Sequence, residues 1–165
     1  MTTSTVGDMA SREQILTSLL SERTVDIVTV GRRSGLTRVT EIWTTPLYGR
    51  LFICGTPNAG KAGVLHQPRD WFANLLARPD FVLRLKRGVE ADLSVRAERI
   101  ADRDLRRAIL GEPSTAYYRD RAMSFESALD HSPMVEVHFG AGDRWLTEAV
   151  RVAWDRLAGA QGERP

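Results

Sequence analysis

The chain has 165 residues, of which 42% are hydrophobic and 27% are charged, and this balance predicts a compact globular domain. Its 23 basic and 21 acidic side chains leave a net charge of only +2, so the charge gives no reason to expect a nucleic-acid partner. A single cysteine, Cys54, excludes an intramolecular disulfide framework and a cysteine-rich zinc site.

The N-terminal residues offer little to bury. They are small and polar, so we expect residues 1–10 to be disordered and residues 11–160 to form one domain. No basic leader followed by an apolar stretch is visible, and no apolar run approaches the roughly 20 residues that span a bilayer. We therefore expect no transmembrane segment and a cytoplasmic location.

The first half of the domain predicts a helix followed by strands and tight turns. Leucine and isoleucine recur at helical spacing behind Ser11, which is a suitable N-cap, and β-branched residues then change the period to that of a strand. The expected order is a helix at 11–23, strands at 25–30, 38–45 and 51–54, a turn at 46–50, and a long loop at 55–68. Loops of that length in compact domains are often functional.

The second half alternates hairpins with helices. We expect a helix capped by Asp70 and ended near Pro79, strands at 81–86 and 91–97, helices at 102–110 and 114–129, a strand at 134–139, and a final helix at 144–157. The charged run at 102–107 is typical of a solvated helix face. Six short strands in hairpins predict an α+β fold whose mostly antiparallel sheet can close into a barrel, while a parallel Rossmann sheet lacks its initial β-α-β alternation.

The turn at 31–35 is the strongest candidate for a binding site. Gly31 and Gly35 permit a tight turn with outward amides, and three arginines and two hydroxyls lie within residues 32–38. Guanidinium groups match phosphate oxygens bidentately, so this pattern predicts an anion grip. A solvated hairpin turn with ordinary surface charge is the alternative.

Three motifs between residues 25 and 99 resemble the deazaflavin-dependent nitroreductase family. Its members carry Thr-x-Gly-Arg-(Lys/Arg)-(Ser/Thr)-Gly-x-x-Arg between two strands, then a strand ending in small residues, then Trp-x-x-Asn-Leu followed by Ala-x-Pro. This chain has TVGRRSGLTR at 29–38, ICGT at 53–56 and WFANLLARP at 71–79. It departs at Pro57, where many members carry a lysine, and in a longer loop before Trp71.

The resemblance implies a split β-barrel, with helices flanking six strands, that binds the deazaflavin coenzyme F420. It assigns the cofactor to Arg32, Arg33, Ser34, Arg38, Val39, Thr40, Cys54, Gly55, Thr56, Pro57, Asp70, Trp71 and Asn74. The implied activity is hydride transfer from reduced F420 to an electron-poor small molecule such as a quinone, nitroaromatic or enone. Thr56, Tyr117 and Tyr118 are the catalytic candidates, as proton donors and as walls of the substrate pocket.

Several alternatives stay open at this point. A non-catalytic binder of a flavin, a deazaflavin or another apolar ligand, and an FMN enzyme of the same fold, both fit an anion grip. Residues 55–62 match a P-loop except that Ala62 replaces the magnesium-binding hydroxyl, which argues against nucleotide hydrolysis. The three histidines show no ligand spacing, so we expect no metal site. The final helix is compatible with a homodimer contact or with a lid.

Overall fold

The computed structural model describes residues 5–57 and 69–162, and the side chains of 11–57 and 69–159. Within these residues the chain forms six strands: β1 (Thr24–Val30), β2 (Thr37–Leu47), β3 (Arg50–Cys54), β4 (Asp80–Leu85), β5 (Ala91–Arg99) and β6 (Met134–Phe139). They close into a barrel in the order β1-β2-β3-β6-β5-β4. Every neighbouring pair is antiparallel, as the sequence predicts.

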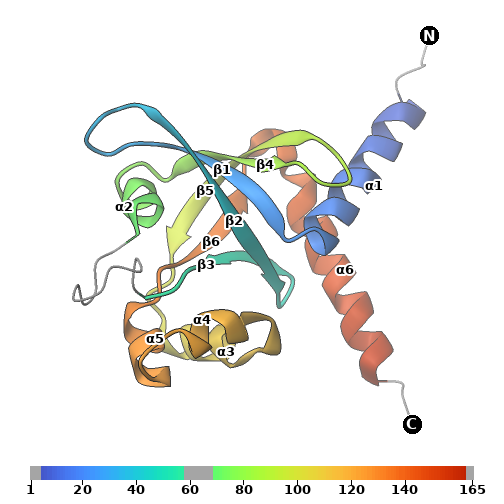
Figure 1. Cartoon of the computed structure of the whole chain (residues 1–165). Helices are drawn as coiled ribbons and strands as arrows, with labels where there is room; N and C mark the ends of the chain where they lie inside the picture. The colour runs from blue at the N-terminus through green and yellow to red at the C-terminus, as the bar shows by residue number, and fades with distance from the viewer. Residues whose placement is uncertain (1–4, 58–68, 163–165) are drawn as a thin grey trace.

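Helices flank the barrel on three sides (Figure 1). They are α1 (Thr5–Ser21), α2 (Asp70–Ala77), α3 (Arg103–Gly111), α4 (Ala116–Asp120), α5 (Phe125–His131) and α6 (Trp145–Gly162), with short 3-10 turns at Pro113–Thr115 and Ala141–Asp143. α1 and α6 lie together on one side, α3 to α5 form a layer below β3, and α2 lies on the side away from α6. No helix of the described residues is long and apolar enough to cross a membrane.

Strand β3 separates two hydrophobic clusters, which explains its unbroken apolar run. Leu51 and Ile53 point into the barrel interior, whereas Phe52 and Cys54 pack against the α3 to α5 layer, and all four are at most 1% exposed. A strand buried on both faces cannot show the period-2 alternation of β1, where buried and half-buried residues alternate. The helices α3 to α5 therefore pack on a strand whose other face is buried in the barrel interior.

The turn between β2 and β3 is tighter than the predicted turn at 46–50. Leu47 pairs with Arg50, so the loop has only two residues, Tyr48 and Gly49, with φ of 56° and 70°. Positive φ at both positions is the type I′ turn that matches strand twist. Pro46 belongs to β2, which tolerates it because pairing with β1 ends at Trp43.

Two predicted helix starts were wrong. α1 begins at Thr5 rather than at Ser11, so it includes residues 5–10 of the stretch expected to be disordered. The helix can extend toward the N-terminus because no proline precedes Ser11. Asp70 is the first residue of α2 and not its cap, because Arg69 occupies the N-cap position without a capping hydrogen bond from its side chain.

The predicted helix at 114–129 is divided in two. α4 ends at Asp120, and α5 starts anew at Phe125 behind Ser124, whose hydroxyl accepts a hydrogen bond of 3.0 Å from the Ser127 amide. An N-cap serine favours a new helix start over continuation of the previous one. The break bends the chain, so that α4 and α5 both pack on the barrel.

Candidate functional site

The turn between β1 and β2 is held by its own backbone. The Gly31 amide donates to the Leu36 carbonyl at 2.8 Å, and the Gly35 amide donates to the Gly31 carbonyl at 2.9 Å. Gly35 has φ of +70°, a conformation that favours glycine. The Ser34 hydroxyl accepts from the Leu36 amide at 3.2 Å. These hydrogen bonds fix the backbone of the turn, and so they also fix the positions from which its side chains extend.

Arginines surround this turn and line a cavity of about 470 Å³. Arg32 forms a long ion pair of 3.7 Å with Asp70, whose side chain is 94% exposed. Arg33 and Arg38 have no ion pair with any described residue. Cations that lack carboxylate partners and face one cavity favour the binding of an external anion.

Helix α2 is fastened to the turn by Asn74. Its side-chain oxygen accepts a hydrogen bond of 3.0 Å from the Arg32 amide, and the side chain is only 6% exposed. Asp70 and Trp71, in the first turn of α2, line the same cavity. The pairing explains why the turn motif and the Trp-x-x-Asn motif occur together, since the second holds the first in place.

A second cavity of about 460 Å³ adjoins the first, because Thr40 and Trp71 line both. Gly55, at the end of β3, forms part of its floor. A Cβ atom on Gly55 would lie 2.8 Å from Pro133 Cγ and 3.1 Å from Trp71 Cζ2, so only glycine fits between these rings. The Gly55 amide donates to the Pro133 carbonyl at 2.9 Å. Gly55 thus lets Pro133 and Trp71 pack directly against the backbone that lines the cavity.

Aromatic side chains form one wall of the second cavity. The Tyr117 ring meets Trp43 edge-on at 5.1 Å and Tyr118 edge-on at 5.6 Å between centroids. The guanidinium of Arg121 lies 3.5 Å from the Tyr117 centroid. Tyr118 is 5% exposed, whereas Tyr117 is 41% exposed, so the pair joins the core of the molecule to the cavity.

Two groups that line this cavity, the Cys54 thiol and the Tyr118 phenol, keep their protons at neutral pH because they are buried. Burial raises the pKa of the Cys54 thiol to about 12, so the cysteine is not a thiolate nucleophile. Burial also raises the pKa of Tyr118 well above its usual value. The Thr56 hydroxyl accepts a short hydrogen bond from the Arg69 guanidinium, which fixes its lone pairs toward the arginine.

The structure thus brings together all but one of the predicted site residues. Those from the turn and from α2 line the first cavity, and Cys54, Gly55, Thr56, Tyr117 and Tyr118 line the second. Pro57 is buried and is not among the lining residues of either cavity. Lys61 and most of the P-loop-like segment lie outside the described residues, as does His66.

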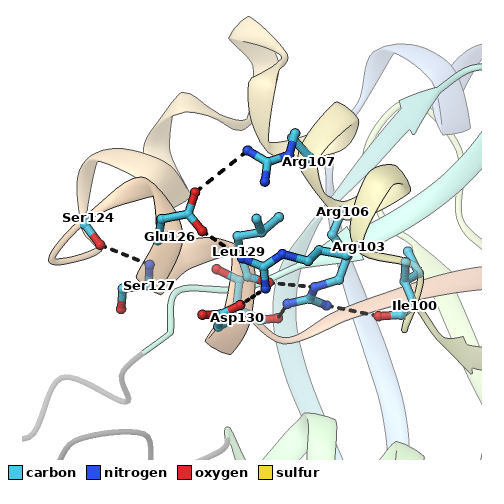
Figure 2. Close-up of polar contacts among 10 residues, drawn as sticks. Ile100, Arg103, Arg106, Arg107, Ser124, Glu126, Ser127, Leu129 and Asp130 are labelled. Carbon is cyan, nitrogen blue, oxygen red and sulfur yellow. Dashed lines mark hydrogen bonds and ion pairs between the residues drawn. The ribbon is translucent and has the colours of Figure 1, made fainter.

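Sequence reasoning missed Arg106, which supports the cavity floor from behind. Figure 2 shows its guanidinium pointing into the space between α3 and α5. It donates to the carbonyls of Leu129 at 2.8 Å, Ile100 at 3.0 Å and Ser132 at 2.7 Å. Because Ser132 precedes Pro133, this clamp positions the proline that packs on Gly55.

The prediction that residues 102–107 form a solvated face was wrong for Arg106, which is 8% exposed. Burial lowers the pKa of its guanidinium, yet three carbonyl acceptors satisfy the charge. The detectable signal was spacing, since Arg106 shares a helix face with Ile109 and Leu110. Arg103 and Arg107 do face solvent, where both pair with Glu126 (Figure 2).

One histidine lies near two carboxylates on the outer surface of the barrel. His138 Nε2 is 2.7 Å from Glu98 and 3.8 Å from Glu136. The Glu136 carboxylate also accepts two hydrogen bonds from Arg50, one from Nε and one from Nη2. Arg50 already pairs with Glu136, so the arrangement is typical of a surface ion-pair network.

The final helix packs on its own chain. Leu146 and Val150 of α6 are buried in the cluster that fills the barrel, and α6 runs beside α1 (Figure 1). None of the residues that line the two cavities belongs to the described part of α6. This geometry gives no support to the lid interpretation.

No family model matches the sequence, and no curated protein matches it. The fold matches solved structures. General stress protein 26 from Bacillus anthracis has a TM-score of 0.55 at 13% identity, covering 79% of this chain and 90% of that one. A protein from Clostridium acetobutylicum related to general stress protein 26, of the pyridoxinephosphate oxidase family, has a TM-score of 0.52 at 12% identity, covering 79% and 82%. The heme storage protein HutZ from Vibrio cholerae has a TM-score of 0.52 at 11% identity, covering 78% and 89%.

These neighbours are split β-barrel proteins, so the predicted fold is confirmed: an α+β split barrel of the FMN-binding type, with six antiparallel strands and flanking helices. At such low identity the likeness concerns the fold alone, and what the site binds is a separate question.

Proposed function

We propose that the protein is an oxidoreductase that uses reduced F420 to transfer a hydride to an electron-poor organic substrate such as a quinone, nitroaromatic or enone. The observation that best supports this is the junction of the two cavities at Thr40 and Trp71. One cavity carries three arginines, of which Arg33 and Arg38 form no ion pair with a described residue, and the other is lined by Gly55 and an aromatic wall. A ligand with a flat ring system and an acidic tail fits this pair.

The residues present suit each part of that cofactor. Arg32, Arg33 and Arg38 would hold the phosphate and the acidic tail, helped by the Ser34 hydroxyl, which can still donate its proton. The ring system would lie over Gly55 and against Trp71, both of which line the second cavity. When bound, reduced F420 supplies the hydride, which carries both electrons of the reduction.

The chain itself orients the reactants, excludes water and supplies the proton. Trp43, Tyr117 and Tyr118 cover one side of the second cavity with apolar surface. Tyr118 keeps its phenolic proton because burial raises its pKa, and Tyr117, in contact with it, is the tyrosine more exposed to solvent. A proton passed from the tyrosine pair to the reduced substrate, and replaced from solvent, completes the two-electron reduction.

An FMN-dependent enzyme is the second candidate, because one structural neighbour belongs to the pyridoxinephosphate oxidase family. The three arginines favour F420 over FMN, since the deazaflavin tail carries carboxylates in addition to a phosphate. A non-catalytic binder is the third candidate, and only a turnover measurement separates it from an enzyme.

Cofactor titrations followed by a turnover assay test the proposal. The purified protein is titrated with F420 and with FMN, and the titrations are repeated on Arg33→Ala and on Arg144→Ala, an exposed arginine that lines neither cavity. We expect F420 to bind more tightly than FMN, Arg33→Ala to weaken F420 binding about tenfold or more, and Arg144→Ala to leave it unchanged. Oxidation of reduced F420 by 2-methyl-1,4-naphthoquinone should then exceed the rate without protein.

Three results would contradict the proposal. Tighter binding of FMN would favour the flavin enzyme, and equal F420 affinity in Arg33→Ala would remove the role of the basic turn. Tight F420 binding without oxidation by quinone, nitroaromatic and enone acceptors would identify a binder.

A further inference from the structure

We infer that the second cavity selects substrates that carry a carboxylate on a planar conjugated system, with Arg121 binding the carboxylate. This inference rests on the proposed function, because it names the class of substrate that the same site would reduce. It is carried by contacts around Arg121, Tyr117 and Trp43 that the hydride chemistry itself does not require.

Arg121 is held in one orientation but keeps donors free. Its guanidinium stacks on the Tyr117 ring at 3.5 Å from the centroid, and one terminal nitrogen donates to the Tyr117 carbonyl at 3.3 Å. Stacking uses the face of the guanidinium and leaves most of its N–H edge for other partners. Among the described residues no carboxylate forms an ion pair with Arg121, although it lines the cavity. A guanidinium edge in this state matches a carboxylate bidentately.

The wall beside Arg121 is built to stack a flat molecule. Trp43 and Tyr117 are 39% and 41% exposed, so large aromatic surfaces remain open at the cavity. Trp43 is fixed from behind by Arg23, whose guanidinium lies 5.7 Å from the indole and donates to the carbonyls of Thr44 and Ser114. Side chains immobilised in this way lose little entropy when a ligand stacks on them.

The charge balance of the cavity favours an anion. Among the described residues that line it, Glu41 is the one acid, and Lys86 already binds that carboxylate at 2.5 Å while also holding Asp26 at 2.7 Å. Arg69 adds a second guanidinium to the lining near Thr56. The tail of the cofactor has its own cations in the first cavity, so Arg121 is available to the substrate.

A matched pair of acceptors tests the inference. 4-Nitrobenzoate and 4-nitrobenzamide share size and nitro group and differ in charge, and their affinities for the F420-loaded full-length protein are measured by calorimetry. We expect the acid to bind about tenfold more tightly than the amide, because a charge-assisted pair replaces a neutral contact. Arg121→Gln should reduce the ratio to about one, whereas Arg144→Gln should leave it unchanged. The ratio of kcat/KM values for the two acceptors should follow the ratio of affinities.

The outcomes separate this inference from the proposed function. Equal affinities in the wild type, absence of binding, or a preference that survives Arg121→Gln would overturn the substrate class, even if F420 binds and is oxidised by a neutral quinone. If F420 does not bind but the protein without cofactor prefers the acid in an Arg121-dependent manner, the cavity is an aromatic-carboxylate site and the proposed function falls.

Discussion

Replacing Arg106 with methionine removes a charged donor from three backbone carbonyls at once while retaining an apolar side chain of similar reach. Each hydrogen bond from a charged donor contributes about 1.5–3 kcal/mol, so three bonds of 2.7 to 3.0 Å give a gross effect of about 4.5–9 kcal/mol. The cost of burying the guanidinium, visible in its lowered pKa, offsets part of this. Leaving a buried carbonyl without its donor costs about 1–3 kcal/mol, and with the desolvation cost of the guanidinium subtracted we expect Arg106→Met to lower the free energy of unfolding by about 3–5 kcal/mol.

Urea unfolding followed by tryptophan fluorescence measures this change. For a chain of 165 residues, 3–5 kcal/mol corresponds to a fall in Tm of roughly 6–20 °C. Arg107→Met is the matched control, because Arg107 is exposed in the same helix and its ion pair with Glu126 is 3.8 Å long; its expected loss is about 0.5 kcal/mol or less. A loss below about 1 kcal/mol for Arg106→Met, or equal losses for both variants, would refute the clamp.

Three further predictions concern the site. Gly55→Ala places a Cβ 2.8 Å from the Pro133 ring, so the free energy of unfolding should fall by about 1–3 kcal/mol and F420 should bind more weakly. Thermal melts and titration measure these changes, and unchanged values would mean that the neighbouring rings move aside without cost. Asn74→Leu removes the side-chain oxygen that accepts a hydrogen bond from the Arg32 amide. The free energy of unfolding should therefore fall by about 1 kcal/mol and the affinity for F420 should fall severalfold, whereas an unchanged affinity would show that the turn keeps its conformation without Asn74. Because burial raises the pKa of Cys54 from its usual value of 9.0 to about 12, the folded state resists ionisation of the thiol and loses stability as pH rises between these values. In urea titrations at successive pH values Cys54→Ala should flatten that fall, and an identical slope would contradict the assignment.

The barrel was predictable because its strands follow simple rules. The β-branched run of β1, the glycine turn and the alternation in β4 and β5 each fix a hairpin from local sequence, and antiparallel hairpins in series leave few topologies other than a meander or barrel. The juxtaposition of the turn with Trp71 was expected only from the resemblance, and the contact of Asn74 with the Arg32 amide is its physical basis.

The features that sequence reasoning missed depend on tertiary contacts. The restart of the helix at Ser124 competes with continuation, and local propensity does not decide between them. Arg106 lies in a charged run, and only the packing of α5 against α3 provides the carbonyls that make its burial favourable. The stacking of Arg121 on Tyr117 likewise arises at the end of α4, in a helix whose end was not predicted.

The central claim, that the basic turn holds the acidic tail of a deazaflavin, is tested most directly by comparing F420 with its chromophore lacking the phosphate and the glutamates. If the turn binds the tail, calorimetry should show F420 binding at least about 100-fold more tightly than the chromophore at low salt, with the difference shrinking as salt is raised. Equal affinities for the two ligands would contradict the account, because the arginines of the turn would then contribute nothing to binding.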